Sequence, residues 1–249
     1  MKYFLPLILL FVNISFCFAG MISFNVTDFK YIKKEAEKGN PYYQGVLANV
    51  YLRGNLCQKR DGQLAYKWAT LAAEKNNPIG MSVLYSIYKV GMPGVPADIK
   101  KAENLSVGAF KQIPKLAEEG CPIAQYHYSN KFYSEKKYDE SLKWLRKSAI
   151  DGNYSIAQDF LAHSYLIGTR SGIKKDKKLG LELYLKAAKQ GYIESELNLA
   201  VLYYSGSYGI QKNLRKAMKW FQAAEKRAPE IAGPMVKKLK GKYGQESRR

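Results

Sequence analysis

The chain has 249 residues, 47% of them hydrophobic, so it is long enough and apolar enough for one folded domain or a short solenoid, and disorder throughout is excluded. Its 40 Lys and Arg against 21 Asp and Glu give a formal net charge of +19, which favours anionic partners. The plainer interpretation of this charge is a set of solvated helix faces covered by lysine stems. Because no dense basic cluster or nucleic-acid motif is present, we expect no nucleic-acid binding.

Residues 1–19 have the pattern of a secretory signal peptide. Lys2 precedes an uncharged run from Phe4 to Phe18, and Ala19 and Gly20 supply small residues for cleavage after Ala19. The alternative is a membrane anchor, but an apolar run of about fifteen residues is short for a bilayer span. The sequence therefore predicts a periplasmic or secreted protein that is not an integral membrane protein after cleavage.

One phrase recurs through the rest of the chain. A phase mark, usually glycine, is followed twelve residues later, or thirteen in the fourth repeat, by an aromatic residue that ends a helix. A bulky and a small residue precede that aromatic residue, except that the second repeat has Tyr85 in the small position. Such tandem repetition predicts a stack of helix pairs. The phase marks are Gly39, Asn76, Gly120, Gly152 and Gly191.

The phrase divides the chain into a short series of units. Residues 20–38 are predicted to form an N-terminal capping helix, and residues 229–249 a C-terminal capping helix, Ile231 to Leu239, with a mobile basic tail. Five repeats lie between them. Their predicted ranges are 39–75, 76–119, 120–151, 152–190 and 191–228.

The loops between the two helices of a repeat also follow a residue pattern. A glycine suits the end of the first helix in every repeat but the third, whose connection is shortened, and Asp98, Asp176 and Asn213 suit the N-caps of second helices. These glycines are structural, and none forms a phosphate loop. The second repeat is the longest, and its extra residues, which include Pro114, predict a local kink or bulge.

With these residues the chain resembles the Sel-one-like subfamily of tetratricopeptide-type repeats, exported bacterial type, over about Ala36 to Ala228. The resemblance implies an all-α fold, a right-handed α/α superhelical solenoid of about five antiparallel helix pairs whose first helices line a concave groove. It also implies an adaptor or scaffold role. One exported group resembles immunity proteins of periplasm-acting phospholipase toxins. Another group is linked to cell-wall ligands, but the paired cysteines that mark it are missing here.

The sequence offers no catalytic or metal constellation. His127 and His163 belong to no HExxH pattern, so no zinc site is predicted. Cys121 and His127 are six residues apart on one predicted helix and therefore diverge. Cys57 and Cys121 fall in different stacked pairs, so we expect two free thiols. The chain is not expected to be an enzyme or to hold a cofactor.

Groove residues follow from the repeat phase, since corresponding positions in the family that the chain resembles face the concave surface. Solvated helix surface is the alternative interpretation of the same positions. The candidate binding residues are Asn49, Arg53, Lys89, Tyr126, Asn130, Tyr133, Asp159, His163 and Tyr204.

Two functions of different class remain open from the sequence. The first is a monomeric, non-catalytic scaffold that binds a protein or peptide in its groove, with an acidic protein or a secreted toxin as the narrower partner. The alternative is a binder of anionic cell-envelope glycan or lipid through the positive surface. A hydrolase is the third interpretation, but no pair of residues in the sequence supports it.

Overall fold

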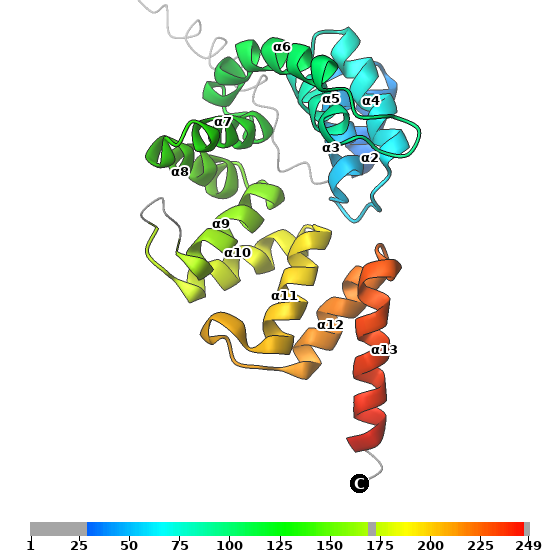
Figure 1. Ribbon diagram of the computed structural model, residues 1–249, viewed down its shortest axis with the longest axis vertical. Helices are drawn as coiled ribbons and strands as arrows, with labels where there is room; N and C mark the ends of the chain where they lie inside the picture. Colours follow the sequence, from blue (N-terminus) through cyan, green and yellow to red (C-terminus); the bar gives the residue numbers. More distant parts are fainter. Residues whose placement is uncertain (1–28, 169–172, 247–249) are drawn as a thin grey trace, which may run out of the picture.

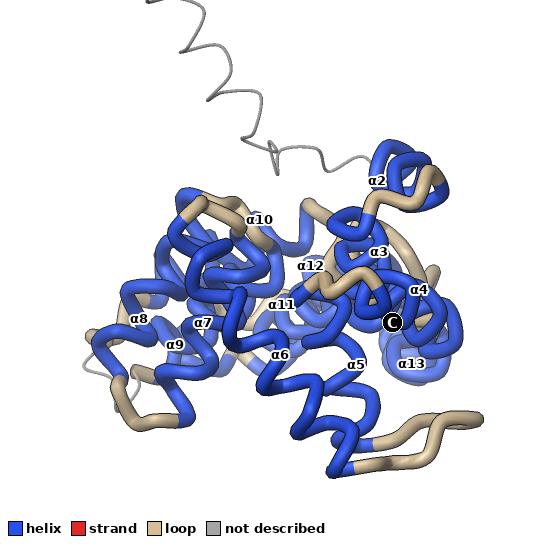
Figure 2. Tube along the Cα trace, turned by 90° about the horizontal axis from the view of Figure 1, so that it is seen from above, coloured by secondary structure: helices blue, strands red, loops and turns tan. Residues whose placement is uncertain are grey.

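The computed structural model describes residues 29–168 and 173–246, so the signal peptide predicted for residues 1–19 lies outside the described residues. Apart from an isolated bridge between Met92 and Val95, the regular structure of the described residues is helical (Figures 1 and 2). The helices are α2 (Phe29–Glu37), α3 (Pro41–Arg53), α4 (Gly62–Glu74), α5 (Pro78–Val90), α6 (Ile99–Glu118), α7 (Pro122–Ser134), α8 (Tyr138–Arg146), η1 (Lys147–Asp151), α9 (Ser155–Ile167), α10 (Lys177–Lys189), α11 (Ile193–Ser205), η2 (Ser207–Gly209), α12 (Leu214–Glu225) and α13 (Pro229–Glu246).

The helices form five consecutive pairs, from α3 with α4 to α11 with α12, flanked by the single helices α2 and α13. Each pair lies within one of the residue ranges 39–75, 76–119, 120–151, 152–190 and 191–228. The predicted all-α solenoid of antiparallel pairs is confirmed. None of the helices in the described part of the chain is long and apolar enough to cross a bilayer.

The second helices of the pairs begin at the caps that the sequence predicts. Asp98, Asp176 and Asn213 accept a hydrogen bond from the backbone N–H three residues on, at 2.9, 3.0 and 2.9 Å. Asp61 does the same in the first pair. Each cap satisfies one N–H that a helix start leaves without an intrahelical partner.

A π-helical turn explains the one irregular spacing in the repeat phrase. Gly39, Gly120 and Gly191 adopt positive φ, as does Asn76, but Gly152 has φ −82° and the left-handed residue of the fourth repeat is Asn153. The turn η1, directly before Gly152, adds one residue to the end of its helix. The structural mark is therefore Asn153, and Tyr165 follows it by the usual twelve residues.

A repeated glutamine ties the first, third and fourth pairs to the helix before them. The Nε2 atoms of Gln44, Gln125 and Gln158 donate to the carbonyls of Ala36, Ala117 and Ala149 at 3.3, 3.1 and 3.0 Å. Ala36 belongs to α2, so α2 packs on α3 as the second helix of a preceding pair would. This contact covers the open end of the stack, as a capping helix must.

Helix lengths differ from the sequence-based expectation at two places. The extra residues of the second repeat, for which a local kink or bulge is predicted, extend α6 to 20 residues with Pro114 inside the helix. The C-terminal helix was expected to end at Leu239, but α13 runs to Glu246. That expectation was wrong because Gly241 and Gly244 lower helix propensity without ending the helix.

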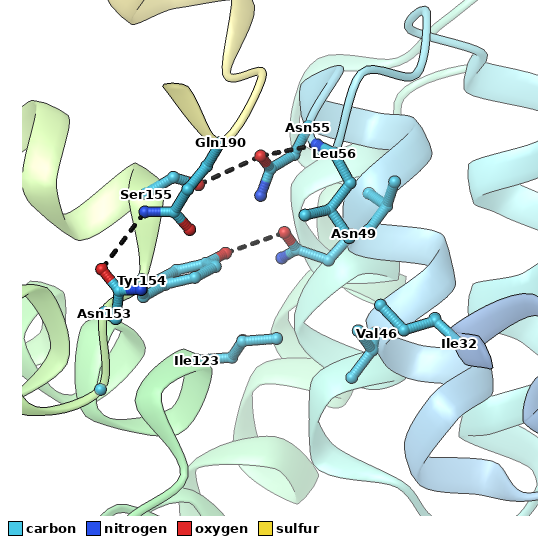
Figure 3. Close-up of a pocket in the computed structure, with 12 residues that line it drawn as sticks. Ile32, Val46, Asn49, Asn55, Leu56, Ile123, Asn153, Tyr154, Ser155 and Gln190 are labelled. Carbon is cyan, nitrogen blue, oxygen red and sulfur yellow. Dashed lines mark hydrogen bonds between the residues drawn. The ribbon is translucent and has the colours of Figure 1, made fainter. Parts of the chain in front are cut away.

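The superhelix turns back so that its first repeat touches the fourth and fifth (Figure 1). Tyr154 Oη donates to Asn49 Oδ1 at 2.9 Å, and Ser155 Oγ lies 3.1 Å from Asn55 Oδ1 (Figure 3). Beside them the Ile193 N–H donates to the Gly54 carbonyl. We call these contacts, together with the ion pair between Arg60 and Glu194 and the approach of Cys57 to Gly191, the closure.

Candidate functional site

The closure shows which helices face the inside of the turn. It is made by α3 and the connection that follows it, and by the residues at the starts of α9 and α11; α3, α9 and α11 are first helices of their pairs. Side chains also join consecutive first helices: Ser82 of α5 contacts His127 of α7, and Asp159 of α9 contacts Ser195 of α11. The five first helices α3, α5, α7, α9 and α11 therefore form one inner layer.

Three of the predicted groove residues are covered by this inner layer. Asn49, Tyr126 and Asp159 are 5%, 3% and 9% exposed, so the expectation that they face an open groove is wrong. Asn49 is covered by Tyr154 across the closure, and the Tyr126 ring packs against the Tyr154 and Phe160 rings. The reason is the tight curvature of the superhelix, because of which these side chains pack against a neighbouring first helix instead of facing solvent.

Asp159 is bound inside the inner layer. Its Oδ1 accepts from Ser195 Oγ at 2.6 Å and from Asn198 Nδ2 at 3.0 Å. Burial raises the pKa of Asp159, and the two hydrogen bonds oppose that rise because they stabilise the carboxylate. This carboxyl group therefore holds α9 to α11 and does not face a partner.

The predicted residues on the outer part of the inner layer separate into three places. His163 is exposed on α9, with Nδ1 at 3.4 Å from Tyr184 Oη, and Tyr133 is exposed beside Tyr138. Tyr204 is partly buried beneath Lys238 of α13. Arg53, Lys89 and Asn130 come together in one pocket.

The pocket has a volume of about 470 Å³ and is formed between α5, α6 and α7, with the end of α3 on one side. α3 packs directly on α5, whereas the lengthened α6 stands between α5 and α7. A volume of this size is within the range of ligand pockets in proteins. The lining residues are Arg53, Ser82, Tyr85, Ser86, Lys89, Ser106, Ala109, Phe110, Ile113, His127, Asn130, Lys131 and Ser134.

The pocket is positively charged. Arg53, Lys89 and Lys131 line it, and no Asp or Glu does. Lys131 reaches Glu135 outside the lining at 3.7 Å, and Lys89 Nζ donates to Tyr85 Oη at 3.2 Å. Hydroxyl and amide groups from Ser82, Ser86 and Asn130 supply the remaining polar surface.

Arg53 is the most confined of these cations. Its Nε is buried and has no hydrogen-bond partner, and no carboxylate of the described residues forms an ion pair with its guanidinium. Its charge acts on the aromatic groups beside it, since it lowers the pKa of His127 and opposes the burial that raises the pKa of Tyr126. A buried donor without an acceptor costs free energy, so an anion at this place would be stabilised.

His127 closes the inner end of the pocket as a neutral ring. Burial, followed by the charge of Arg53, lowers its pKa from 6.5 to about 4. Its Nε2 lies 3.1 Å from Ser82 Oγ, which itself donates to the Ile79 carbonyl. At neutral pH the imidazole therefore accepts or donates hydrogen bonds without adding positive charge.

Within residues 29–168 and 173–246, no three His, Cys, Asp or Glu side chains gather in a way that could hold a metal ion. Both cysteines of the described chain are free, Cys57 exposed and Cys121 buried, which confirms the prediction of two unbridged thiols. Burial raises the pKa of Cys121 and keeps it a thiol, which is the unreactive form.

Sequence reasoning missed most of the pocket's second-repeat residues, although the sequence carried two signals for them. Tyr85 occupies the position that is small in the other repeats, and it lines the pocket. The second repeat is also the longest, and its extra residues lengthen the helix that separates α5 from α7. Both departures from the phrase mark the place where regular packing gives way to a pocket.

Only a small space remains between the distant repeats at the closure. Beside the closure lies a space of about 50 Å³ lined by Ile32, Val46 and Ile123 together with the polar side chains of the closure (Figure 3). Gln190 Nε2 donates to Asn153 Oδ1 at its edge. Its size suits about one water molecule, so it is a packing gap and not a ligand site.

A comparison with protein-family models identifies the kind of repeat that these helices form. The Sel1 repeat model matches residues 42–77, 122–153, 155–192 and 193–227, which together make up more than half of the chain. The chain belongs to the Sel1 repeat family. The match leaves out α5 and α6, the pair that forms most of the pocket, so the pocket lies where the chain departs from the Sel1 pattern.

Two of the curated relatives that the chain resembles are much longer than it is. A putative sel1-like repeat-containing protein of Acanthamoeba polyphaga mimivirus is 28% identical over 68% of the chain and 31% of the relative. A putative ERAD-associated E3 ubiquitin-protein ligase component of Schizosaccharomyces pombe is 30% identical over 66% of the chain and 25% of the relative. The chain thus spans about a quarter to a third of the length of these relatives.

Solved structures with related repeats include three bacterial ones. The protective antigen c5321 of uropathogenic Escherichia coli is 26% identical, with a TM-score of 0.48, over 85% of this chain and 44% of that one. A Sel1 repeat protein of Oxalobacter formigenes is 25% identical, with a TM-score of 0.47, over 80% and 75%. The immunity protein Pa5087 of Pseudomonas aeruginosa is 22% identical, with a TM-score of 0.47, over 74% and 67%.

Proposed function

We propose that this Sel1 repeat protein is a non-catalytic scaffold whose pocket between α5, α6 and α7 holds a segment of a protein partner. Sel1 repeat proteins act as protein-interaction scaffolds, and the pocket of about 470 Å³ is the observation that supports this location. Its lining comes from the first three repeats, and its charges have no carboxylate within the lining. Exposed Asn130 and Lys89 stand at the pocket, where a partner can reach them.

The narrower form of this proposal concerns the compartment and the partner. The signal peptide predicted for residues 1–19 supports export to the periplasm or the outside, and the family resemblance supports an immunity or inhibitor protein that captures a periplasm-acting toxin. N-terminal sequencing of the protein recovered from the cell envelope tests the first part. A chain that still carries Met1 would contradict cleavage after Ala19.

Site-specific photo-crosslinking in the producing cells tests the pocket. A photoreactive phenylalanine analogue replaces Asn130 in one variant and the exposed Lys143 of α8 in a matched control. We expect a discrete adduct with one partner from position 130 and none from position 143. The partner, identified by mass spectrometry, is then titrated calorimetrically against the wild-type chain. Equal adducts from both positions would contradict the proposal.

A second function is favoured by a cluster of lysines elsewhere on the molecule. Lys177, Lys178 and Lys216 surround a pocket of about 340 Å³ beside the connection between α11 and α12. In this alternative the chain binds anionic envelope lipid or glycan through its surface charge. Flotation with vesicles containing phosphatidylglycerol tests it. Binding at about 50 mM salt should be lost near 300 mM, because exposed charges are screened, whereas capture of a partner in the pocket should persist.

A further inference from the structure

The pocket contains a cation that the protein itself leaves without an anion. Arg53 Nε is buried and unpaired, and the helices α3, α5 and α7, which supply most of the lining, contain no Asp or Glu; Glu135 follows α7 directly. Glu135 pairs with Lys131 and Lys137 instead, at 3.7 and 2.9 Å. Lys131 at the rim of the pocket therefore has a carboxylate partner, whereas Arg53 in its interior has none among the described residues.

Other donor groups at the pocket also suit a single anion. The amide of Asn130 and the ammonium group of Lys89 can donate to an oxygen atom in the pocket, whereas the Ser82 and Ser86 hydroxyls already donate to the carbonyls of Ile79 and Ser82. The interior backbone N–H groups of α5, α6 and α7 are used within the helices, so side chains alone would hold the anion. A carboxylate accepts several such hydrogen bonds, and a guanidinium binds it with two.

Resting on the proposed function, we propose that the pocket is a receptor for an acidic side chain, Asp or Glu, of the partner's segment, with Arg53 as its charge partner and Lys89 and Asn130 at its mouth. A side chain fits this place better than a chain terminus because the inner layer does not end at the pocket. It continues from α7 to α9, so a bound segment has surface on which to continue. A segment that follows the inner layer can insert a side chain and continue past the pocket. The commitment is therefore to an internal acidic residue.

Three small probes test the chemistry before any partner is known. Uniformly 15N-labelled protein is titrated with Nα-acetylglutamic acid α-amide, with the neutral Nα-acetylglutamine α-amide, and with N-acetylglycine as a C-terminal mimic, all at one low ionic strength. The signals followed are the Arg53 Nε–H and the Asn130 side-chain amide. We expect saturable shifts with the glutamate probe at millimolar concentration and at least ten-fold weaker binding of the glutamine probe.

Variants locate the binding and provide the control. Arg53→Gln should weaken the glutamate probe at least five-fold, and so should Lys89→Glu, which places a carboxylate at the mouth of the pocket and, being exposed, leaves the fold intact. Arg215→Gln, an exposed arginine on α12, removes the same charge at a distance and should change the affinity less than two-fold. Circular dichroism of each variant checks folding.

The outcomes separate this inference from the proposed function. Equal binding of the glutamate and glutamine probes, or unchanged binding in Lys89→Glu, would overturn the carboxylate receptor. At least five-fold tighter binding of N-acetylglycine would assign the pocket to a chain terminus and overturn the side-chain assignment. If the glutamate probe fails while the adduct at position 130 persists, the scaffold function stands without this anchor.

Discussion

At the scale of single residues, His127 makes the stability of the protein depend on pH. Its pKa is about 4 in the folded chain and 6.5 in the unfolded chain, so the unfolded state takes up the proton first as the pH falls. The stabilisation is therefore complete above pH 6.5 and is lost between pH 6.5 and 4. A shift of this size corresponds to no more than about 3 kcal/mol.

We expect urea unfolding to show this loss. Carboxylates also titrate below pH 5, so the measurement is the difference in free energy of unfolding between the wild-type chain and His127→Gln, from pH 7 to pH 4. The difference should shrink steadily as the pH falls. A difference that stays constant over this range would show that His127 is not held neutral in the fold. The groups that face the ring are Arg53, Ser82 and Tyr126.

Glu196 occupies, in α11, the position of the repeated glutamine. Gln44, Gln125 and Gln158 are the fourth residues of their helices, as Glu196 is of α11, but Glu196 forms a buried ion pair with Arg227. Burial raises the pKa of Glu196, against the hydrogen bond from Arg227. Removing the arginine would leave an acid in the interior without its partner.

Arg227→Ala should therefore cost about 3–5 kcal/mol of unfolding free energy at neutral pH. The double variant with Glu196→Gln should recover most of that loss, because it supplies the residue type that the first, third and fourth repeats use. Denaturant unfolding of the two variants and of Glu196→Gln alone closes the cycle. If the double variant is no more stable than Arg227→Ala, the buried charge is not the source of the loss.

At the scale of elements, the glycine that ends α10 serves two purposes, and a matched glycine separates them. Gly120 and Gly191 both follow second helices with positive φ, +94° and +77°. A Cβ at Gly120 would meet nothing within 4 Å, whereas a Cβ at Gly191 would lie 2.6 Å from the backbone nitrogen of Cys57. Only Gly191 is needed both for its conformation and for the closure.

Gly120→Ala should cost about 1–2 kcal/mol, the strain of a left-handed residue with a side chain. Gly191→Ala should cost at least about 1–3 kcal/mol more, because backbone must move to admit the methyl group. Thermal and urea unfolding of the two variants gives the difference directly. Equal costs would mean that the backbone at the closure moves to admit the methyl group at no cost in free energy.

Elements were predictable where repetition exposed them, and contacts between distant repeats were not. The phase of glycine and aromatic residues located the five pairs, and Asp98, Asp176 and Asn213 located helix starts, because these signals act within a few residues of where they stand. The burial of Asn49 depends on Tyr154, 105 residues away, so local spacing could not reveal it. Arg53, Lys89 and Asn130 were named from the phase, but the length of α6 decided that they share a pocket.

At the scale of the whole molecule, the closure makes a short solenoid behave as one unit. In an open stack each repeat contacts only its neighbours, and a perturbation spreads step by step. Here the Tyr154 hydroxyl binds Asn49 directly, and losing that partner leaves a buried amide unsatisfied at about 1–3 kcal/mol. The first and fourth repeats should therefore open together.

Hydrogen exchange measures this coupling. Tyr154→Phe should raise amide exchange both at the end of α3 and at the start of α9, although α4 to α8 separate them in the chain. Tyr165→Phe is the control, since the Tyr165 hydroxyl accepts from Arg146 on the neighbouring helix, at 3.2 Å. Its effect should stay within α8 and α9. An effect of Tyr154→Phe confined to α9 would contradict the coupling.

The hydrogen bond between Gly54 and Ile193 also sets an order of events during synthesis. A ribosome adds roughly 5–20 residues per second, so the first repeat emerges on the order of 10 s before its partners in the fifth. During that interval Asn49, Asn55 and Arg60 face water with their final contacts unmade. The polar contacts of the first repeat therefore stay open to solvent until α11 has been made, and the closure is the last long-range contact of the first repeat to form.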